Sequence, residues 1–162
     1  MKKTTFAFIL MFTSFNLFAQ EQKEKLYDPK ANAETDIARA VEQAAKENKH
    51  VILMGGGNWC SWCYLFNNFI TQDKQIDSLV KADYVLYHLN YSKENKNDAT
   101  FAKYGFPQRF GFPVFIILNE KGERIHTQNS GLLEEGKGYN KEKVMDFFGG
   151  WNRKALDPAQ YK

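Results

Sequence analysis

Residues 57–63 read GNWCSWC and contain Cys60 and Cys63, the only cysteines of the 162-residue chain. They follow the apolar run His50–Met54, which is typical of a buried strand, after a glycine-rich turn. A helix that begins at Cys60 would direct its free N–H groups and the positive end of its dipole at the Cys60 sulfur. Such a position lowers the pKa of a thiol and makes it a nucleophile. Cys63 lies one turn later on the same face, where it can attack a mixed disulfide formed at Cys60, so the spacing indicates a redox pair.

Two other uses of this cysteine pair are open. One is a structural disulfide, but closing a ring of four residues removes only about 2 kcal/mol of unfolded-state freedom, against about 3 for a 15-residue loop. The other is Cu(I), which binds soft thiolates. Zinc and haem are not expected, because the chain has no second CxxC or paired-histidine motif and has Tyr64 where haem attachment needs histidine. We therefore favour redox chemistry, with no resident metal and no cofactor beyond the Cys60–Cys63 disulfide.

Residues 1–19 have the features of an export signal. Lys2 and Lys3 form a short basic start, and the apolar stretch 6–18 is shorter than the roughly 20 residues needed to span a bilayer. Cleavage after Ala19 would leave 143 residues and, by removing both lysines, would lower the formal charge from +3 to +1. An uncleaved membrane anchor is the alternative. We expect a soluble protein that is periplasmic or extracellular.

The rest of the chain suits a single domain. Residues 20–34 are polar and charged, which predicts a loose arm, and residues 35–162 are expected to form one domain with its own core. Aromatic residues make up 15% of the chain, which favours strands and an aromatic core. No dense block of lysine and arginine remains, so nucleic acid is not expected as a partner. We expect a monomer.

Hydrophobic periodicity predicts an alternating order of helices and strands. Helices are predicted over 35–48 with Thr35 as its cap, from Cys60 to about Ile70, after Thr71 or Asp73, from a cap at Asp98 to Gly105, and over 141–148. Strands are predicted at 50–54, 84–89, 114–118 and 123–127. Strands separated by helices favour parallel pairing, and the last tight turn favours an antiparallel hairpin. The result is a mixed four-stranded sheet covered on both faces, with the cysteine pair at the carboxyl end of a central strand.

The sequence resembles the thioredoxin superfamily at two places. One is Trp59–Cys63, and the other is the triplet Gly111-Phe112-Pro113, which leads directly into the predicted strand 114–118. The Ser-Trp dipeptide between the cysteines is similar to that of exported thioredoxin-like proteins rather than housekeeping thioredoxin. The resemblance covers about residues 35–150 and implies a three-layer α/β/α fold with a mixed, mostly four-stranded sheet. It also implies a cis bond before Pro113, with Pro107 as the competing candidate.

The resemblance further implies a substrate-binding role for residues beside the cysteines. The turn at Pro113 is expected to expose the backbone of Phe112 beside Cys60, where it would pair with an extended client segment. Trp59 and Trp62 are expected to offer apolar surface to the client, with core or rim positions as the alternative. Trp59 is favoured because it flanks the nucleophile.

One departure from the family pattern concerns proton transfer. Members often carry a buried carboxylate six residues before the first cysteine, near the second sulfur, but this chain has Met54 there, which cannot accept a proton. His88, in the predicted strand 84–89, is a candidate replacement because its unperturbed pKa near 6.5 suits proton transfer. The alternative is a partly exposed His88 without a role. His50 and His126 are interpreted as surface or strand-end residues.

These features predict an exported thiol–disulfide oxidoreductase that acts on protein clients. Cys60 would attack a client disulfide as the nucleophile and Cys63 would resolve the mixed disulfide, or the reverse sequence would deliver oxidation. A reductase or isomerase is favoured, because the Ser-Trp dipeptide has no charged residue that stabilises the thiolate. Such an enzyme needs an electron donor or acceptor, for which we expect a membrane protein. The alternative is a Cu(I)-binding protein or a thioredoxin-like module that docks clients without turnover.

Overall fold

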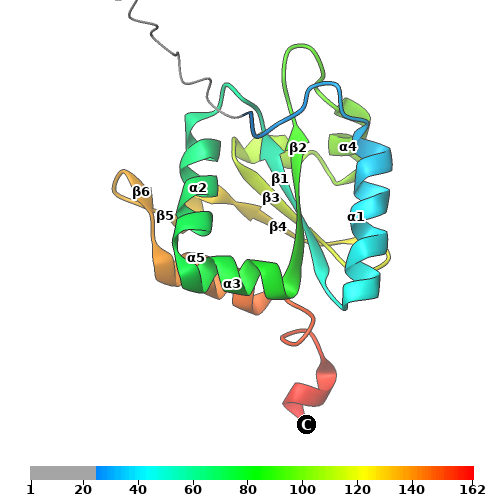
Figure 1. Ribbon diagram of the computed structural model, residues 1–162, viewed down its shortest axis with the longest axis vertical. Helices are drawn as coiled ribbons and strands as arrows, with labels where there is room; N and C mark the ends of the chain where they lie inside the picture. The colour runs from blue at the N-terminus through cyan, green and yellow to red at the C-terminus, as the bar shows by residue number, and fades with distance from the viewer. Residues whose placement is uncertain (1–24) are drawn as a thin grey trace, which may run out of the picture.

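A mixed sheet of four strands, in the order β2–β1–β3–β4, forms the centre of the computed structural model (Figure 1). The structure describes residues 25–162, so the predicted signal 1–19 and the start of the predicted arm lie outside the described residues. The central strands are β1 (His50–Gly56), β2 (Tyr84–Asn90), β3 (Val114–Leu118) and β4 (Arg124–Asn129). A small hairpin, which the sequence analysis did not predict, is formed by β5 (Glu134–Glu135) and β6 (Gly138–Tyr139).

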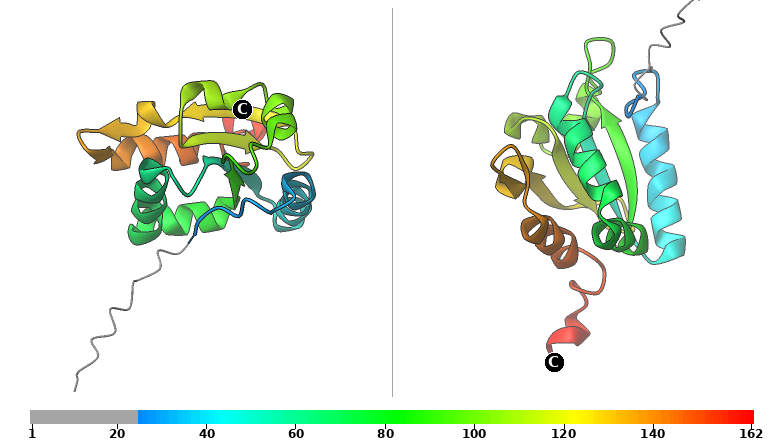
Figure 2. Two further views of the ribbon diagram at one scale, coloured as in Figure 1. Left: turned by 90° about the horizontal axis from the view of Figure 1, so that it is seen from above. Right: turned by 60° about the vertical axis from the view of Figure 1, so that its left-hand side comes forward.

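Helices cover both faces of this sheet, so the predicted three-layer α/β/α fold is confirmed (Figure 1). The α-helices are α1 (Ala33–Glu47), α2 (Ser61–Gln72), α3 (Lys74–Asp83), α4 (Asp98–Lys103) and α5 (Lys141–Gly150). The short 3-10 helices are η1 (Pro107–Phe110), η2 (Ser130–Leu133) and η3 (Pro158–Tyr161), the last of which lies in a C-terminal segment that extends beyond the layers (Figure 2). None of the helices within residues 25–162 is long and apolar enough to cross a membrane.

The direction of β3 differs from the prediction. β1 and β2 are parallel, and β3 and β4 form an antiparallel hairpin, as predicted. β3, however, runs antiparallel to β1 although α4 separates it from β2. To run parallel to β1, β3 would need a connection that carries the chain from the end of β2 back to the opposite edge of the sheet. The helices of this connection, α4 and η1, are too short to do so. β3 therefore begins beside the carboxyl end of β1, where Val114 pairs with Gly55.

Alternation along the strands divides the core in two. Ile52 and Met54 face α2, α3 and α5, in a cluster that also contains both cysteines. Val51 and Leu53 face the opposite way, toward α1 and α4. Because both faces of β1 and β3 are covered, every residue of these two strands is buried. The continuous apolar run that precedes the cysteines has this physical cause.

The helix caps correct two predictions and decide a third. Asn32 caps α1 by accepting a hydrogen bond from the Thr35 N–H, so Thr35 lies inside the helix. Asp98 is the first residue of α4 rather than its cap. Of the two candidates before α3, Asp73 is the cap, and its carboxylate accepts two backbone N–H groups of the first turn.

Residues 25–32 do not form the loose arm that their polar composition predicts. Tyr27 is only 1% exposed and belongs to the same cluster as the cysteines. The burial of this one ring holds the segment on the domain, because a tyrosine side chain removes a large apolar area from water. His50 is the first residue of β1, so of its two predicted places it occupies the strand end. It is buried there, with its Nδ1 2.8 Å from the carbonyl oxygen of Trp151.

Candidate active site

Cys60 lies between β1 and α2, at the carboxyl end of a central strand, as predicted. It is the N-cap of α2, and its Sγ accepts a hydrogen bond of 3.1 Å from the Cys63 N–H. The preceding turn is closed by the Cys60 N–H, which donates to the carbonyl of Gly57 at 2.9 Å. The free N–H groups and the dipole of the helix start therefore act on the Cys60 sulfur, which favours a thiolate there once the pair is reduced.

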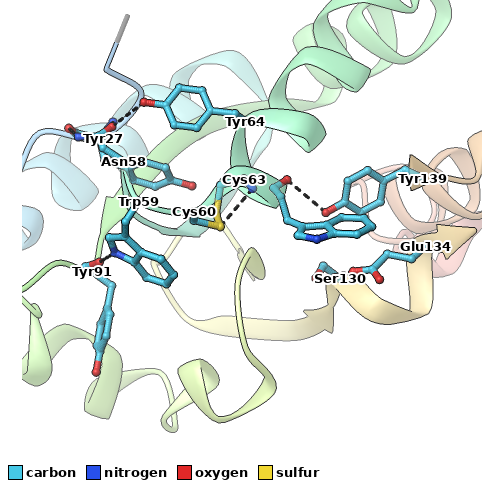
Figure 3. Close-up of a disulfide and its surroundings, with 11 residues drawn as sticks. Tyr27, Asn58, Trp59, Cys60, Cys63, Tyr64, Tyr91, Ser130, Glu134 and Tyr139 are labelled. Carbon is cyan, nitrogen blue, oxygen red and sulfur yellow. Dashed lines mark hydrogen bonds between the residues drawn. A yellow bond between two sulfur atoms is a disulfide. The ribbon is translucent and has the colours of Figure 1, made fainter. Parts of the chain in front are cut away.

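The two cysteines are joined by a disulfide and differ in exposure (Figure 3). Cys60 keeps 5% of its surface exposed, whereas Cys63 has none. Of the two cysteines, only Cys60 has surface that a sulfur from outside the molecule can reach, and Cys63 can react only with a group already attached to Cys60. The small exposed area also means that such a group must approach closely before the sulfurs meet.

Trp59 stands at the surface beside the pair. Its side chain is 60% exposed, although its indole N–H is fixed by a hydrogen bond of 2.7 Å to the carbonyl of Tyr91. The Trp59 ring meets the Phe112 ring edge-on, with 5.5 Å between the centroids. The apolar ring is therefore held in one orientation while it remains open to a partner.

The turn before β3 lies next to Trp59. Within the described chain, the Phe112–Pro113 peptide bond is cis and the bond before Pro107 is not. Because Val114 pairs with the strand that precedes the cysteines, this turn sits beside the end of β1. The structure thus brings together three predicted site residues, Trp59, Phe112 and Pro113.

Trp62 occupies a different place from the other predicted site residues. It is half-buried, and its ring meets the ring of Tyr139 edge-on at 5.6 Å. Its carbonyl oxygen also accepts a hydrogen bond of 3.4 Å from the Tyr139 hydroxyl. Trp62 was expected either to offer apolar surface to a client or to lie in the core or at its rim. Its contacts are those of a rim aromatic residue packed on β6.

Asn58 fastens the N-terminal segment to the active-site loop. Its Oδ1 accepts the Tyr27 N–H at 3.1 Å, and its Nδ2 donates to the Tyr27 carbonyl at 2.7 Å, so both backbone groups of Tyr27 are paired. The Tyr64 hydroxyl donates to the same Oδ1 at 3.0 Å. Figure 3 shows these residues on one side of the disulfide, with Trp59 and Tyr91 below them and Tyr139 on the far side.

His88 lies on the strand next to Met54. The two residues are paired in register, and Met54 is fully buried on the side of the sheet that carries the cysteines. His88 meets the Tyr27 ring edge-on at 5.4 Å, and its buried Nε2 has no hydrogen-bond partner among residues 25–162. Burial lowers the pKa of His88 below its ordinary value, so the ring is neutral at pH 7. Its proposed role in proton transfer stays a prediction.

Gly56, the last residue of β1, provides space for the groups around the second sulfur. A Cβ added there would lie 2.5 Å from the Cys63 Sγ and 2.5 Å from the Tyr27 Oη. Both distances are far below ordinary van der Waals contact, and neither atom is free to move away, since one is in the disulfide and the other is buried. Only glycine fits between Cys63 and Tyr27.

Replacing Gly56 with alanine is therefore expected to destabilise the oxidised protein by about 1–3 kcal/mol, the usual effect of overpacking a core. Urea unfolding of the oxidised protein measures this difference. Gly149→Ala is the matched control, because an added Cβ there meets nothing within 4 Å. Equal stability of the two variants would contradict the close approach at Gly56.

Four residues of this site were not found by sequence reasoning. Asn58, Tyr27, Tyr91 and Tyr139 were given no role in the site. The available signal for Tyr27 was the apolar pair Leu26-Tyr27 inside an otherwise polar stretch. The contacts of the other two tyrosines depend on long-range packing, which leaves no local pattern.

A disulfide at a helix start, placed at the end of a central strand beside a cis-proline turn, defines a thioredoxin-like redox centre. The comparison with protein families agrees, because residues 37–137 match the model of the Thioredoxin-like domain. The chain belongs to this family.

Solved structures with a similar fold include three disulfide-related proteins. A disulphide isomerase from Xylella fastidiosa Temecula1 has a TM-score of 0.66 at 23% identity, over 76% of this chain and 93% of that one. DsbH oxidoreductase has a TM-score of 0.53 at 19% identity, over 71% and 82%. The C-terminal domain of DsbD from Neisseria meningitidis, in its oxidised form, has a TM-score of 0.52 at 17% identity, over 74% and 96%. At these identities the likeness establishes the fold.

A separate sequence similarity points to a different kind of protein. Ribosome maturation factor RimP from Prochlorococcus marinus (strain MIT 9312) is 32% identical over 77 residues, and that of strain MIT 9515 is 34% identical over 77 residues. The chain spans about half the length of these curated relatives, 48% in both cases. Because the match is partial, we assign no activity to this chain from it. The family match, the fold and the cysteine pair agree with one another.

Proposed function

We propose that this protein is an exported thiol–disulfide oxidoreductase that exchanges disulfides with protein clients. The observation that carries the proposal is the asymmetry of the cysteine pair. Cys60 is the helix cap with an exposed edge, and Cys63 is fully buried behind it and bonded to it. A structural staple needs no such difference between its two sulfurs.

The reaction follows from this geometry. In the reduced protein, the Cys60 thiolate attacks one sulfur of a client disulfide, and the other client sulfur leaves with the electron pair and takes up a proton. Cys63 then loses its proton and attacks Cys60. The bond between Cys60 and the client breaks, the second client sulfur leaves as a thiolate, and the Cys60–Cys63 disulfide re-forms. The client gains two electrons and the protein loses two.

Client docking is proposed at the surface formed by Trp59 and Phe112. The fixed and exposed Trp59 ring supplies apolar contact next to the reactive sulfur. The backbone at Phe112, beside the cis turn, is proposed to pair with an extended client segment, a form of strand addition. The narrow opening at Cys60 favours clients whose disulfide lies in an extended or mobile segment.

Location and direction are further parts of the proposal. The signal-like residues 1–19 support export, followed by action outside the cytoplasm as a monomer. Reduction or isomerisation of clients is favoured over oxidation, with electrons supplied by a membrane protein and with no cofactor other than the disulfide itself. The names of the three structural neighbours are compatible with this class of activity.

Reduction of insulin by dithiothreitol tests the proposed activity. The wild-type protein is expected to shorten the delay before the insulin B chain precipitates, and Cys60→Ser is expected to behave like dithiothreitol alone. Turbidity at equal protein concentrations measures the difference. Identical curves for the wild type and Cys60→Ser would remove the proposed activity.

A further inference from the structure

The Tyr27 hydroxyl is a buried polar group that has no partner within residues 25–162. The residue is 1% exposed, and its Oη makes no hydrogen bond to any residue in the described part of the chain. The backbone of Tyr27 is held firmly by two hydrogen bonds with the Asn58 side chain, one donated and one accepted by Tyr27. An unpaired hydroxyl on a fixed backbone calls for an explanation, because buried hydroxyls nearly always find a partner.

This hydroxyl faces the second cysteine. The Tyr27 Oη and the Cys63 Sγ each lie 2.5 Å from the position that a Cβ would take at Gly56, so they are at most twice that distance apart. Figure 3 shows the Tyr27 ring beside the disulfide, with its hydroxyl directed toward the cysteines. In the oxidised protein the Cys63 sulfur is committed to the disulfide and is a poor acceptor. Reduction turns it into a thiol or thiolate, which accepts more strongly.

The surroundings leave few other groups for this sulfur. Met54, which shares a cluster with Cys63, cannot take up a proton. The titratable groups that face Tyr27 from the packed elements are Tyr64 of α2, His88 of β2 and Tyr139 of β6. Burial, and to a smaller extent these two tyrosines, raises the pKa of Tyr27 far above its ordinary value. The hydroxyl therefore keeps its proton and is available to donate a hydrogen bond.

We propose that the Tyr27 hydroxyl donates a hydrogen bond to the Cys63 sulfur whenever the Cys60–Cys63 bond is open, and so stabilises the reduced pair and the attacking Cys63 thiolate. This deepens the proposed function, on which it rests for the resolving step. In that step Cys63 gives its proton to solvent and attacks Cys60, and the electron pair of the broken bond leaves with the client sulfur, which takes up a proton from solvent. Tyr27 keeps its own proton throughout.

The proposed hydrogen bond from Tyr27 exists only in the reduced protein, and this decides how it changes the reduction potential. An interaction made only in the reduced form favours reduction and makes the pair a stronger oxidant. Tyr27→Phe removes the hydroxyl and keeps the ring. It should shift the equilibrium with glutathione toward the disulfide by about tenfold, which corresponds to a potential about 30 mV more negative.

The experiment equilibrates each variant in glutathione buffers of graded ratio, traps free thiols with a maleimide and counts the added mass. Tyr84→Phe is the matched control. Tyr84 is also a buried tyrosine, but its hydroxyl is already paired, donating to the Phe148 carbonyl at 2.6 Å. It lies at the start of β2, the opposite end of the sheet from the cysteines. We expect a potential shift in Tyr27→Phe alone. An unchanged potential, or an equal shift in Tyr84→Phe, would overturn the proposal.

Thermal unfolding separates this role from a purely structural one. Because the hydroxyl has no partner among the described residues of the oxidised form, Tyr27→Phe should leave the melting temperature of that form unchanged or raised. It should lower the melting temperature only in the reduced form. Equal losses in both forms would indicate a structural role and overturn the proposal. The glutathione equilibrium needs no protein client, so it tests Tyr27 independently of the insulin assay. If the protein fails to reduce insulin but Tyr27→Phe shifts the potential, the proposed function is wrong and the role of Tyr27 still holds.

Discussion

Replacing Cys63 with alanine is expected to leave the protein covalently joined to its clients through Cys60. The exposed edge of Cys60 still allows attack on a client disulfide, but the buried sulfur that would release the product is gone. Turnover in the insulin assay should fall by at least about 100-fold, because an intramolecular attack has an effective concentration far above that of thiols in solution. Non-reducing gels of the protein mixed with an oxidised client would show the adduct as a band that reductant removes.

The double variant Cys60→Ala, Cys63→Ala is the control and should form no adduct. The single variant Cys60→Ala tests whether Cys63 can act as the nucleophile, since it leaves only the sulfur that has no exposed surface. We expect it to form no adduct while the protein is folded. Efficient capture of clients by Cys63 alone would contradict the assignment of nucleophile and resolving cysteine.

Replacing Phe66 with alanine is expected to lower the free energy of unfolding by about 3–5 kcal/mol, the range for deleting a buried phenylalanine side chain. Phe66 is 1% exposed and lies on α2 one turn after Cys63. Its ring packs against Phe115 of β3, with 4.4 Å between the centroids, and against Tyr139 of β6 at 4.8 Å. The substitution would leave a cavity between the helix that carries the cysteines and the sheet.

Urea unfolding of the oxidised protein measures this loss, with Leu132→Ala as the control. Leu132 is 67% exposed, so its truncation should change the stability by no more than about 0.5 kcal/mol. Phe66→Ala is also expected to weaken client reduction, because the start of α2 is less firmly held on the sheet. A loss below about 1 kcal/mol in Phe66→Ala would contradict its central place in the core.

Much of the fold was predictable because its signals are local. The apolar run before Gly55, the stripe of α1 and the tight turn before β4 each specify an element from a few neighbouring residues. The direction of β3 was not predictable in this way, since it depends on where a short connection delivers the chain. The caps of α1 and α4 were misplaced by one to three residues, because several residues near each helix start could serve as the cap.

In the candidate site, too, residues with a local sequence signal were predicted, and residues placed by long-range contacts were not. Cys60 and Cys63 were evident from their spacing, and the cis bond at Pro113 followed from a family resemblance that the family match now supports. Asn58 and Tyr27 were missed because their partnership spans 31 residues and appears only when the chain is folded. Sequence reasoning identified the absence of a carboxylate at Met54 and named His88 as a candidate replacement, but it gave no sign that Tyr27 lies beside the second sulfur.

The bond between Asn58 and Tyr27 matters for anyone who produces this protein. The family match begins at residue 37, and a recombinant form trimmed to that boundary would lack Tyr27 altogether. Such a shortened polypeptide would retain both cysteines and all four strands of the central sheet. Asn58, however, would lose its backbone partners, and the space beside Gly56 would open to solvent. Redox titrations of the trimmed form would then describe a chemically altered centre.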